Sequence, residues 1–452
     1  MSSSVVPKSL LNLTSLRTLG LGESGLHGEF PSGIFHLPHL QNLEIWDEEG
    51  LTGQIPDFIN STYPLQNLIL YYTGITGILP DSFANLKSLK QLVVHHSEFH
   101  GSIPTSLWNL PQITYVDLSF NNFSGSLPSS ISNLTQITSL DLSFNNFSGS
   151  LPSSISHLTQ ITSLDLSFNN FSGSLPSSIS NLTQITSLDL PSNNFHGILP
   201  SSISNLTQIR WLDLASNNFS GVLPSSISNL RNLTYLFLAN NYFTGPFFSW
   251  DAILPQLEYL DVSNNSLTGP LPSQVVVPSN LRSLIIGQNL INGTIPSWVF
   301  ELPALEYLDL SYNKLIGHTL EFQSTSLEII DLSNNYLHGT VPNSTFELRN
   351  LTHLILSSNS FSGTIPESNR FSENLNPPPS TFEEEDSEPV SGFGWEVILP
   401  GYGFGLVVGL VMGYLMFSFG KPQCLVKMVE GVGNRKEKRL KSNARRRGGR
   451  RN

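Results

Sequence analysis

The most regular feature of the chain is a hydrophobic pattern that repeats about every 24 residues. Apolar residues recur as L-x-x-L-x-L and are followed at fixed offsets by Asn, an apolar residue, Gly and Pro. The interval between units is 24 residues, with one exception of 25 and one of 22. A fixed period of this length is typical of a solenoid, because no unit can bury its apolar edge alone and neighbours must stack. The units start at Leu16, Leu40, Leu65, Leu89, Ile113, Ile137, Ile161, Ile185, Ile209, Leu233, Leu257, Leu281, Leu305, Leu327 and Leu351.

Each unit has a direct local interpretation. The alternation at Leu140 and Leu142 predicts a short strand with both leucines pointing inward. Asn145 is expected to turn inward and bond the backbone of neighbouring turns, Gly149 permits a conformation that a Cβ would forbid, and Pro152 starts the return leg. The pattern therefore predicts an α/β solenoid of about fifteen units with parallel strands on its concave face.

One unit is repeated almost without change. The stretch at 119–142 recurs at 143–166 with His157 as its only difference, and again unchanged at 167–190. The copies indicate recent duplication. Their near-identical faces would give a ligand little with which to distinguish one turn from the next.

The composition removes several classes of function. Only 12% of the residues are charged, and the net charge is −12. Residues 420–452 hold twelve Lys and Arg against Glu430 and Glu437, so the rest of the chain carries −22. That excess of acid argues against nucleic-acid binding, which depends on a basic face. A single cysteine, Cys424, excludes an internal disulfide and a Cys-based zinc site.

The period ends after Pro366, where the composition changes. A Pro-rich acidic segment follows, and then 23 residues from Val397 to Phe419 without a charge, long enough to cross a hydrocarbon core of about 30 Å. Because the basic run begins directly after, the positive-inside tendency puts the tail in the cytoplasm and the solenoid outside. We expect a repeat ectodomain over 1–370, a juxtamembrane linker over 371–394, a transmembrane helix over 395–420 and a cytoplasmic tail over 421–452.

Glycines recur every four residues in the uncharged stretch and would form one face of a helix, the geometry that lets a second helix approach closely. The short tail has none of the motifs of a kinase, and its basic run predicts contact with anionic lipid. Palmitoylation of Cys424 stays open beside the simpler alternative of an unmodified thiol. The helix-pairing glycines are Gly401, Gly405, Gly409 and Gly413.

The repeat closely resembles the plant extracellular class of leucine-rich repeats, over roughly residues 8–370, and the G-x-I/L-P half of each unit carries the likeness. With the span and basic tail, the chain looks like a plant leucine-rich-repeat receptor-like protein. The resemblance implies a non-catalytic plasma-membrane protein that binds a microbial or developmental ligand, a peptide, protein or glycan. Signalling would be lent by a partner receptor kinase paired through the membrane helix.

Two alternatives remain from the sequence. One is a secreted-type inhibitor or cell-wall-binding repeat protein, against which the uncharged span argues. The other is a truncated, non-functional receptor copy. The family has a signal peptide and cap cysteines, whereas this chain begins MSSSVVPKSLLNLTSL inside a repeat, with an apolar edge that would be left open to water.

Sequons of the form N-x-S/T are unusually frequent, which fits an extracellular glycoprotein. His157 removes the sequon that its sister copies keep. The fourteen asparagines are Asn12, Asn60, Asn122, Asn133, Asn146, Asn170, Asn181, Asn205, Asn218, Asn232, Asn264, Asn292, Asn343 and Asn350.

Strand alternation predicts which side chains the concave face presents. In the copies this face reads Ser, Asp, Ser, with a column of carboxylates at Asp117, Asp141, Asp165, Asp189 and Asp213; no third ligand or histidine completes a metal or acid–base site, so we predict no catalytic residue, metal or cofactor. Outside the copies aromatic residues replace the serines, and exposed aromatics often mark binding surfaces, although they also favour strands. The candidate ligand-binding residues are Trp46, Tyr71, His95, Trp211, Tyr235, Phe237, Tyr259 and Tyr307.

Overall fold

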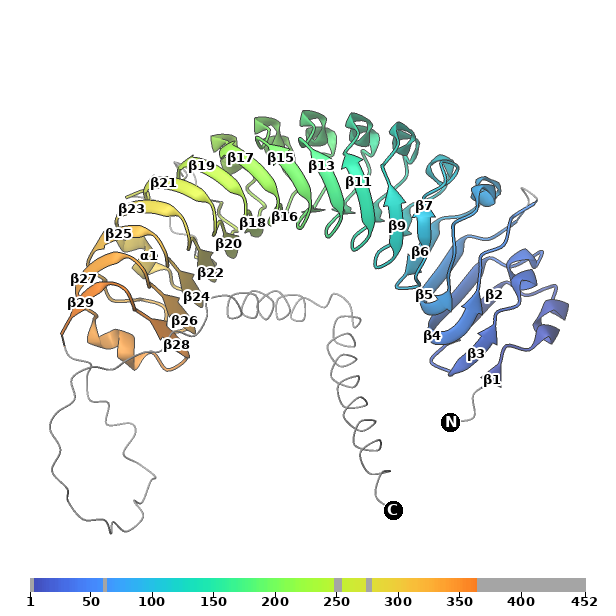
Figure 1. Ribbon diagram of the computed structural model, residues 1–452, viewed down its shortest axis with the longest axis horizontal. Coiled ribbons are helices and arrows are strands. Elements are labelled where there is room, and N and C mark those ends of the chain that lie inside the picture. The colour runs from blue at the N-terminus through green and yellow to red at the C-terminus, as the bar shows by residue number, and fades with distance from the viewer. Residues whose placement is uncertain (1–3, 60–62, 248–253, 274–278, 364–452) are drawn as a thin grey trace, which may run out of the picture. The chain divides into compact units, whose positions relative to one another are not determined.

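The computed structural model describes residues 4–59, 63–247, 254–273 and 279–363. The chain divides into two units, Met1–Ser368 and Asn369–Asn452, and the described residues all belong to the first. By itself this unit is a solenoid that curves into an arc (Figure 1). No helix in the described ranges has both the length and the hydropathy to cross a bilayer. The predicted linker, transmembrane helix with its glycines, basic tail and Cys424, as well as the Asn60 sequon, lie outside the described residues.

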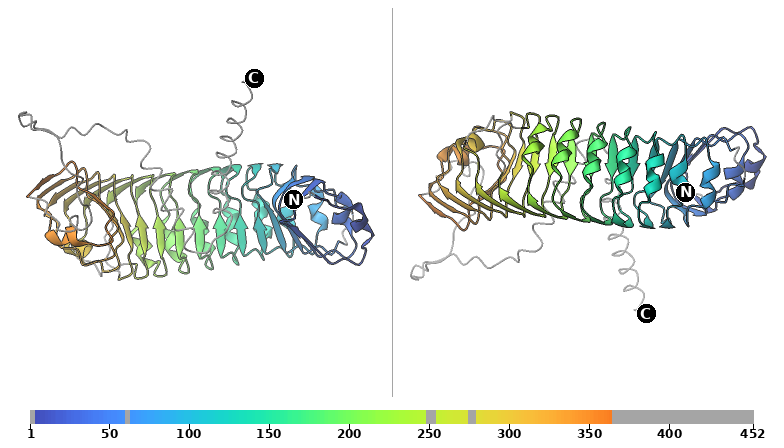
Figure 2. Two further views of the ribbon diagram at one scale, coloured as in Figure 1. Left: turned by 90° about the horizontal axis from the view of Figure 1, so that it is seen from below. Right: turned by 90° about the horizontal axis from the view of Figure 1, so that it is seen from above.

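The predicted row of parallel strands is confirmed on the concave side of the arc. Within the described ranges, each of the fifteen units contributes one strand, and neighbouring strands pair in parallel with the register of the repeat, as in Leu140 opposite Leu164. Figure 2 shows these strands side by side along the solenoid. The strands are β2 (Thr18–Gly22), β4 (Asn42–Gly53), β5 (Asn67–Ile75), β6 (Gln91–His95), β8 (Tyr115–Asp117), β10 (Ser139–Asp141), β12 (Ser163–Asp165), β14 (Ser187–Asp189), β16 (Trp211–Asp213), β18 (Tyr235–Phe237), β20 (Tyr259–Asp261), β22 (Ser283–Ile285), β24 (Tyr307–Asp309), β26 (Ile329–Asp331) and β28 (His353–Ile355).

A second parallel sheet lies beside the first and was not predicted. Its strands follow the inward asparagine of each unit and run across one flank of the arc (Figure 1). At the amino-terminal end β1 (Ser4–Val5) pairs with β3 (Leu26–Glu29), which joins β4. The second sheet consists of β7 (His100–Ser102), β9 (Asn122–Gly125), β11 (Asn146–Ser150), β13 (Asn170–Gly173), β15 (Asn194–Gly197), β17 (Asn218–Val222), β19 (Tyr242–Pro246), β21 (Ser266–Pro270), β23 (Leu290–Thr294), β25 (Lys314–Gly317), β27 (Tyr336–Thr340) and β29 (Ser360–Ser362).

The return legs are shorter than an α/β solenoid suggests. In most units a proline with φ near −65°, such as Pro176, is followed by one turn of 3₁₀-helix, because the ring fixes the backbone at the start of the turn. The described part of the chain has one α-helix, α1 (Ser297–Glu301). The 3₁₀ turns are Lys8–Asn12, Ser32–His36, Asp81–Asn85, Leu107–Asn109, Ser129–Asn133, Ser153–His157, Ser177–Asn181, Ser201–Asn205, Ser225–Asn229 and Asn343–Glu347.

The leucine core is continuous from unit to unit. Leu140 and Leu142 are fully buried, as predicted, and so are their counterparts in neighbouring units. Buried phenylalanines add a stacked row with ring centroids 6.1–6.3 Å apart, which we call the phenylalanine spine. In the first unit the core is less complete, since Leu16 and Leu21 are only partly buried, as the sequence predicts. The spine consists of Phe99, Phe123, Phe147, Phe171, Phe195, Phe219 and Phe243.

From Asn121 to Asn359 the inward asparagine of each unit forms a ladder that holds the turns together. In the first four units the residues that stand in its place are Ser24, Glu48, Thr73 and Ser97. The Asn145 side-chain amide donates to the Leu118 carbonyl of the previous unit at 2.8 Å and to Ser143 O of its own unit at 3.0 Å. Its Oδ1 accepts the backbone N–H of Phe123 at 2.9 Å. Gly149 has a φ of 79°, in the left-handed region that favours glycine. Both sequence predictions are thereby confirmed.

Candidate functional site

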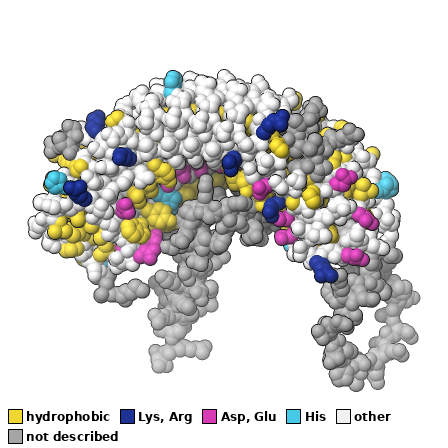
Figure 3. All heavy atoms as spheres, turned by 180° about the vertical axis from the view of Figure 1, so that it is seen from behind, with side chains coloured by type: hydrophobic (Ala, Val, Ile, Leu, Met, Phe, Trp, Pro, Cys, Tyr) yellow, Lys and Arg dark blue, Asp and Glu magenta, His cyan; other side chains and the backbone are white. Residues whose placement is uncertain are grey.

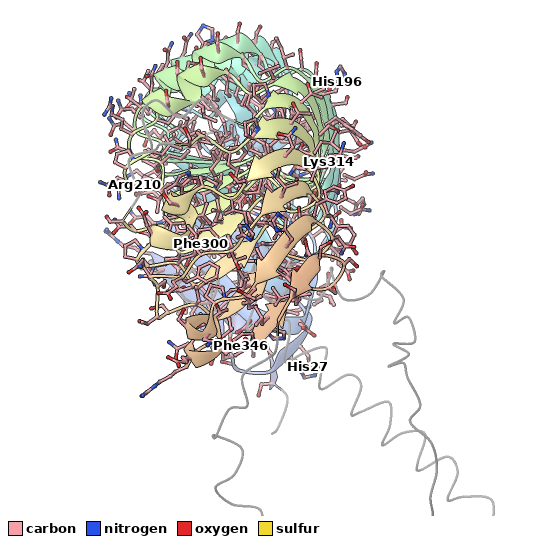
Figure 4. The ribbon with its side chains drawn as sticks, turned by 90° about the vertical axis from the view of Figure 1, so that its left-hand side faces the viewer. His27, His196, Arg210, Phe300, Lys314 and Phe346 are labelled. Atoms are coloured by element: carbon pink, nitrogen blue, oxygen red, sulfur yellow. The ribbon has the colours of Figure 1, made fainter. Side chains whose placement is uncertain are left out.

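The concave strands present their outward residues in columns, one residue from every unit in each column. One column at the start of the strands holds the most varied side chains, and the next column holds mostly carboxylates. A further column follows most of the strands. Figure 3 shows hydrophobic and acidic side chains together in the hollow of the arc, while the outer surface is mostly uncharged. Figure 4 shows Arg210, before a strand, on the opposite flank from His196 and Lys314 of the second sheet.

The structure brings four of the candidate aromatic residues together at the start of β16, β18 and β20. The ring centroids of Trp211 and Tyr235 are 4.7 Å apart, and those of Tyr235 and Tyr259 are 5.0 Å apart with nearly parallel planes. Phe237 lies 5.3 Å from Trp211. Trp211, Tyr235 and Tyr259 are half-buried, so part of each ring faces solvent. We call these four residues the aromatic patch.

Two features give the aromatic patch polar capacity. The indole Nε1 of Trp211 is buried and has no acceptor among the described residues, an arrangement that costs free energy. Burial, followed by the charge of Glu258, raises the pKa of Tyr235, so its hydroxyl keeps the proton. The patch therefore combines flat apolar surface with a donor, the composition common at protein contact sites.

Tyr307 does not join the aromatic patch, and Phe237 joins it as a buried member. Tyr307 is separated from Tyr259 by Ser283, which pairs with both. Phe237 is buried, at 7% exposure, which corrects its prediction as an exposed aromatic: it occupies the carboxylate column, where Trp211 and Tyr235 lie beside it.

A separate aromatic group lies toward the amino-terminal end. Trp46 is half-buried and lies against Gly22, where a Cβ would come within 2.0 Å of the indole. Tyr71 is half-buried and stacks on His95 with centroids 5.0 Å apart. His95 is only 7% exposed, so its prediction as an exposed residue was also wrong. Because residue 22 is glycine, the Trp46 indole can lie directly on the backbone there. This contact indicates that Trp46 serves mainly in packing.

His95 is held in a buried polar cluster. Its Nδ1 lies 2.6 Å from Ser119 Oγ, and that hydroxyl donates to Asp117 Oδ1 at 2.5 Å, so the hydroxyl accepts from His95. Ser119 is 1% exposed and its proton points to Asp117, an arrangement opposite to that of a nucleophile activated by histidine. Burial alone would raise the pKa of Asp117, but His95, 3.6 Å away, and the Ser119 hydrogen bonds hold it below its ordinary value.

The carboxylate column is aligned as predicted. Asp141 pairs with Asp165 and Asp117 in register, and Phe237 interrupts the column between Asp213 and Asp261. Most of these carboxylates accept the backbone N–H two residues on, for example that of Ser143 to Asp141 Oδ1 at 2.9 Å, whereas Asp189, followed at that distance by Pro191, accepts the Ser187 hydroxyl at 2.6 Å. The bond from the backbone N–H caps the turn after the strand. No group of three or more metal-ligating side chains occurs within the described ranges.

Burial changes the charge of this column. It raises the pKa of Asp141 to about 8, with a further contribution from the charges of Asp165 and Asp117. Burial likewise raises the pKa of Asp213 to about 7 and that of Asp309 to about 6. In a mildly acidic medium Asp141 and Asp213 are therefore largely protonated and act as hydrogen-bonding carboxylic acids, whereas Asp117 stays charged.

Sequence reasoning missed the last concave column, in which Tyr72, His96, Phe120, Phe144 and Phe168 follow the strands. We call these five residues the outer aromatic column. Neighbouring rings stack, with centroids 4.1 Å apart between Tyr72 and His96 and between successive phenylalanines from Phe120 to Phe168. A 24-residue recurrence of Phe one position after the Ser of L-x-L-S would have identified its phenylalanines, whereas Tyr72 and His96 follow Tyr71 and His95.

The described sequon asparagines share one property: all thirteen side chains are exposed. Most fall into two rows. Asn122, Asn146, Asn170 and Asn218 begin strands of the second sheet, and Asn133, Asn181 and Asn205 end 3₁₀ turns. His157 occupies the gap in the second row, as the sequence indicates.

Family models described as leucine rich repeat match residues 64–123, 180–243 and 255–315, and a second such model matches 136–158, 160–182, 326–348 and 350–378. Together these matches span more than half of the chain. Comparison with curated proteins finds no match.

Solved structures with this architecture include several plant receptor ectodomains. A TDR receptor is 33% identical, with a TM-score of 0.75 over 80% of this chain and 63% of that chain. The plant peptide hormone receptor RGFR1, in complex with RGF2, is 30% identical, with a TM-score of 0.71 over 80% and 66%. The Arabidopsis receptor kinase HAESA, in complex with the peptide hormone IDA and the co-receptor SERK1, is 28% identical, with a TM-score of 0.57 over 83% and 75%. This chain spans just under two thirds of the first two receptor chains.

Proposed function

The chain belongs to the leucine-rich-repeat family, and from that premise we propose that it is the ligand-binding part of a non-catalytic cell-surface receptor-like protein. Similarity to plant receptor ectodomains, two of them bound to peptide hormones, supports a peptide as the ligand. The single observation that carries the proposal is the aromatic patch. Stacked, half-exposed rings on a rigid sheet offer contact area without a large entropic cost of ordering.

The position of the aromatic patch suits an extended ligand. The rings of Trp211, Tyr235 and Tyr259 occupy one column across β16, β18 and β20, so a chain lying along the solenoid would meet a new ring about every 4.8 Å. Arg282, bonded to Glu306 at 2.6 Å, lies beside the path in the next units and is exposed. A ligand with an aromatic or aliphatic anchor for the rings and a carboxylate near Arg282 would match these groups.

Signalling belongs to a partner in this proposal. The HAESA complex contains a co-receptor, and the described residues of this chain form repeats only. We propose that a receptor kinase pairs with the predicted transmembrane helix through Gly401, Gly405, Gly409 and Gly413, and that the basic tail contacts membrane lipid. Replacing Gly405 and Gly409 with Leu would then abolish co-purification of the kinase while leaving ligand binding unchanged.

The binding proposal is tested with the full chain expressed in plant cells. Extracellular peptide fractions are screened for binding, and the Trp211→Ala and Tyr235→Ala variants are measured with the peptide that binds. We expect each variant to weaken binding by a factor of at least about 10, as truncation of a central aromatic contact costs about 2 kcal/mol. Tyr115→Ala is the matched control, because Tyr115 occupies the same column outside the aromatic patch. Equal losses in all three variants, or none, would contradict the proposal.

A further inference from the structure

The outer aromatic column leaves part of its apolar surface exposed, unlike the buried phenylalanine spine. Phe144 is 37% exposed and Phe168 is 47% exposed, whereas the spine residues Phe147 and Phe171 are at most 2% exposed. All members of the column have φ between 49° and 54°, a left-handed turn that directs the ring outward. A contiguous apolar stripe of this kind on a folded surface normally has an occupant.

The stack is open at one end. The rings of Phe144 and Phe168 are nearly parallel, at 12°, so each covers a face of the other and leaves its edge to solvent. At the next unit the position is Ser192, which is too small to cover the far face of Phe168. The larger exposure of Phe168 is consistent with this open face.

A row of sequons runs beside the stack in register. Two residues after each phenylalanine stands an exposed sequon asparagine, as in Phe168 and Asn170. The residue between them, Asn169, turns inward and bonds the Leu142 carbonyl at 2.9 Å, so Phe168 and Asn170 lie on the outside on either side of it. Asn170 accepts a hydrogen bond from Asn194 through Oδ1, which leaves Nδ2, the atom that a sugar would occupy, outside that bond.

We propose that the N-linked glycans of Asn122, Asn146 and Asn170 pack on Phe120, Phe144 and Phe168 and cover this stripe. The inference rests on the proposed extracellular location. A pyranose ring offers a face of C–H groups, and the N-acetyl methyl of the first sugar is apolar, so both match an aromatic surface. A sugar tethered two residues away has a high effective concentration, whereas a free ligand loses translational freedom on binding.

The near-identity of the three units favours this occupant over a specific ligand. Three identical rings beside three identical sequons can make the same contact with three identical sugars. They offer no distinct contacts by which a specific ligand would be recognised. Within the three copies every ring has its sequon, whereas Ser192 precedes Asn194, which is no sequon, and Ser216 precedes Asn218, which is one.

The experiment measures glycan and ring in a double-mutant cycle on the full chain purified from plant cells. Asn170→Gln is made in the natural chain and in a Phe168→Ser chain, and melting temperatures are compared. We expect Asn170→Gln to lower the melting temperature by about 1–2 °C in the natural chain and to have no effect in the Phe168→Ser chain. Ser at 168 copies Ser192, so the fold tolerates it, and the Asn146→Gln and Phe144→Ser pair repeats the cycle one unit earlier.

The chain supplies a matched control. Asn218 is an exposed sequon in the same row, but Ser216 stands two residues before it, so Asn218→Gln is expected to leave the melting temperature unchanged. Glycopeptide mass spectrometry reports occupancy of each site. If Asn170 carried no glycan, or if Asn170→Gln and Asn218→Gln changed the melting temperature equally, the proposed glycan contact would be wrong. The proposed extracellular location would not be affected. A chain without sugar at any sequon would also overturn the proposed extracellular location.

Discussion

At the scale of single residues, the carboxylate column makes stability depend on pH in an unusual direction. Burial raises the pKa of Asp141 to about 8, against about 4 in an unfolded chain. Between these values the folded protein holds a proton that the unfolded chain releases, so the free energy of unfolding falls as pH rises from about 4 to about 8. Each such group contributes at most about 1.4 kcal/mol per pH unit.

Asp141→Asn tests this dependence. The amide keeps an acceptor for the Ser143 N–H and cannot ionise, so we expect a flatter profile and a more stable protein at pH 8. Urea unfolding at pH 5, 6.5 and 8 measures it. Glu301→Gln removes an exposed carboxylate at the end of α1 and should leave the profile unchanged. An unchanged profile for Asp141→Asn would show that the buried group is ionised in the folded protein as it is in the unfolded chain.

Residue roles were predictable where one geometry dominates. The repeat alone predicts the inward turn of Asn145 and the left-handed backbone of Gly149, because only one backbone geometry closes the turn of each unit. Which aromatics stay exposed was not predictable. His95 and Phe237 lie in outward positions but are covered by rings from neighbouring units, and such lateral packing depends on side chains 24 residues away.

At the scale of elements, the second sheet escaped prediction because its strands read N-F-S-G-S, and Asn, Ser and Gly are poor strand formers. Stacking imposes these strands: Phe147 enters the spine and the Asn ladder fixes the turn before each strand. Local strand propensity therefore predicts a loop in this segment, whereas packing against the neighbouring units holds the chain extended.

The Asn ladder is the element-scale bond between turns, and Asn193→Ala tests it. The amide of Asn193 donates to Leu166 O at 2.8 Å and its Oδ1 accepts from Phe171 N at 2.9 Å. Alanine would leave these buried backbone groups unsatisfied, so we expect a loss of about 3 kcal/mol in the free energy of unfolding. The neighbouring Asn194→Ala, at an exposed position, should cost less than about 0.5 kcal/mol in the same urea titration. If both variants lost the same free energy of unfolding, the Asn ladder would contribute no more to stability than an exposed asparagine does.

At the scale of the whole solenoid, stability is close to a sum over units and their nearest-neighbour contacts. Every backbone and side-chain ladder joins one turn to the next, as in Asp141 to Asp165 or Phe147 to Phe171. The near-identical units at 119–190 then set the length of the arc without defining a site of their own, whereas the aromatic patch lies in the varied units after them.

Deleting residues 143–166 separates these two roles. The junction of Leu142 with Ser167 reproduces a sequence that the chain already contains, so core, Asn ladder and second sheet continue without a defect. We expect a folded protein with unchanged circular dichroism per residue and unchanged affinity for a peptide that binds the aromatic patch. Deleting only 143–154 removes half a unit, breaks every ladder and should yield an aggregating chain. Lost affinity in the folded 143–166 deletion would instead show that the repeated units take part in recognition or set its spacing.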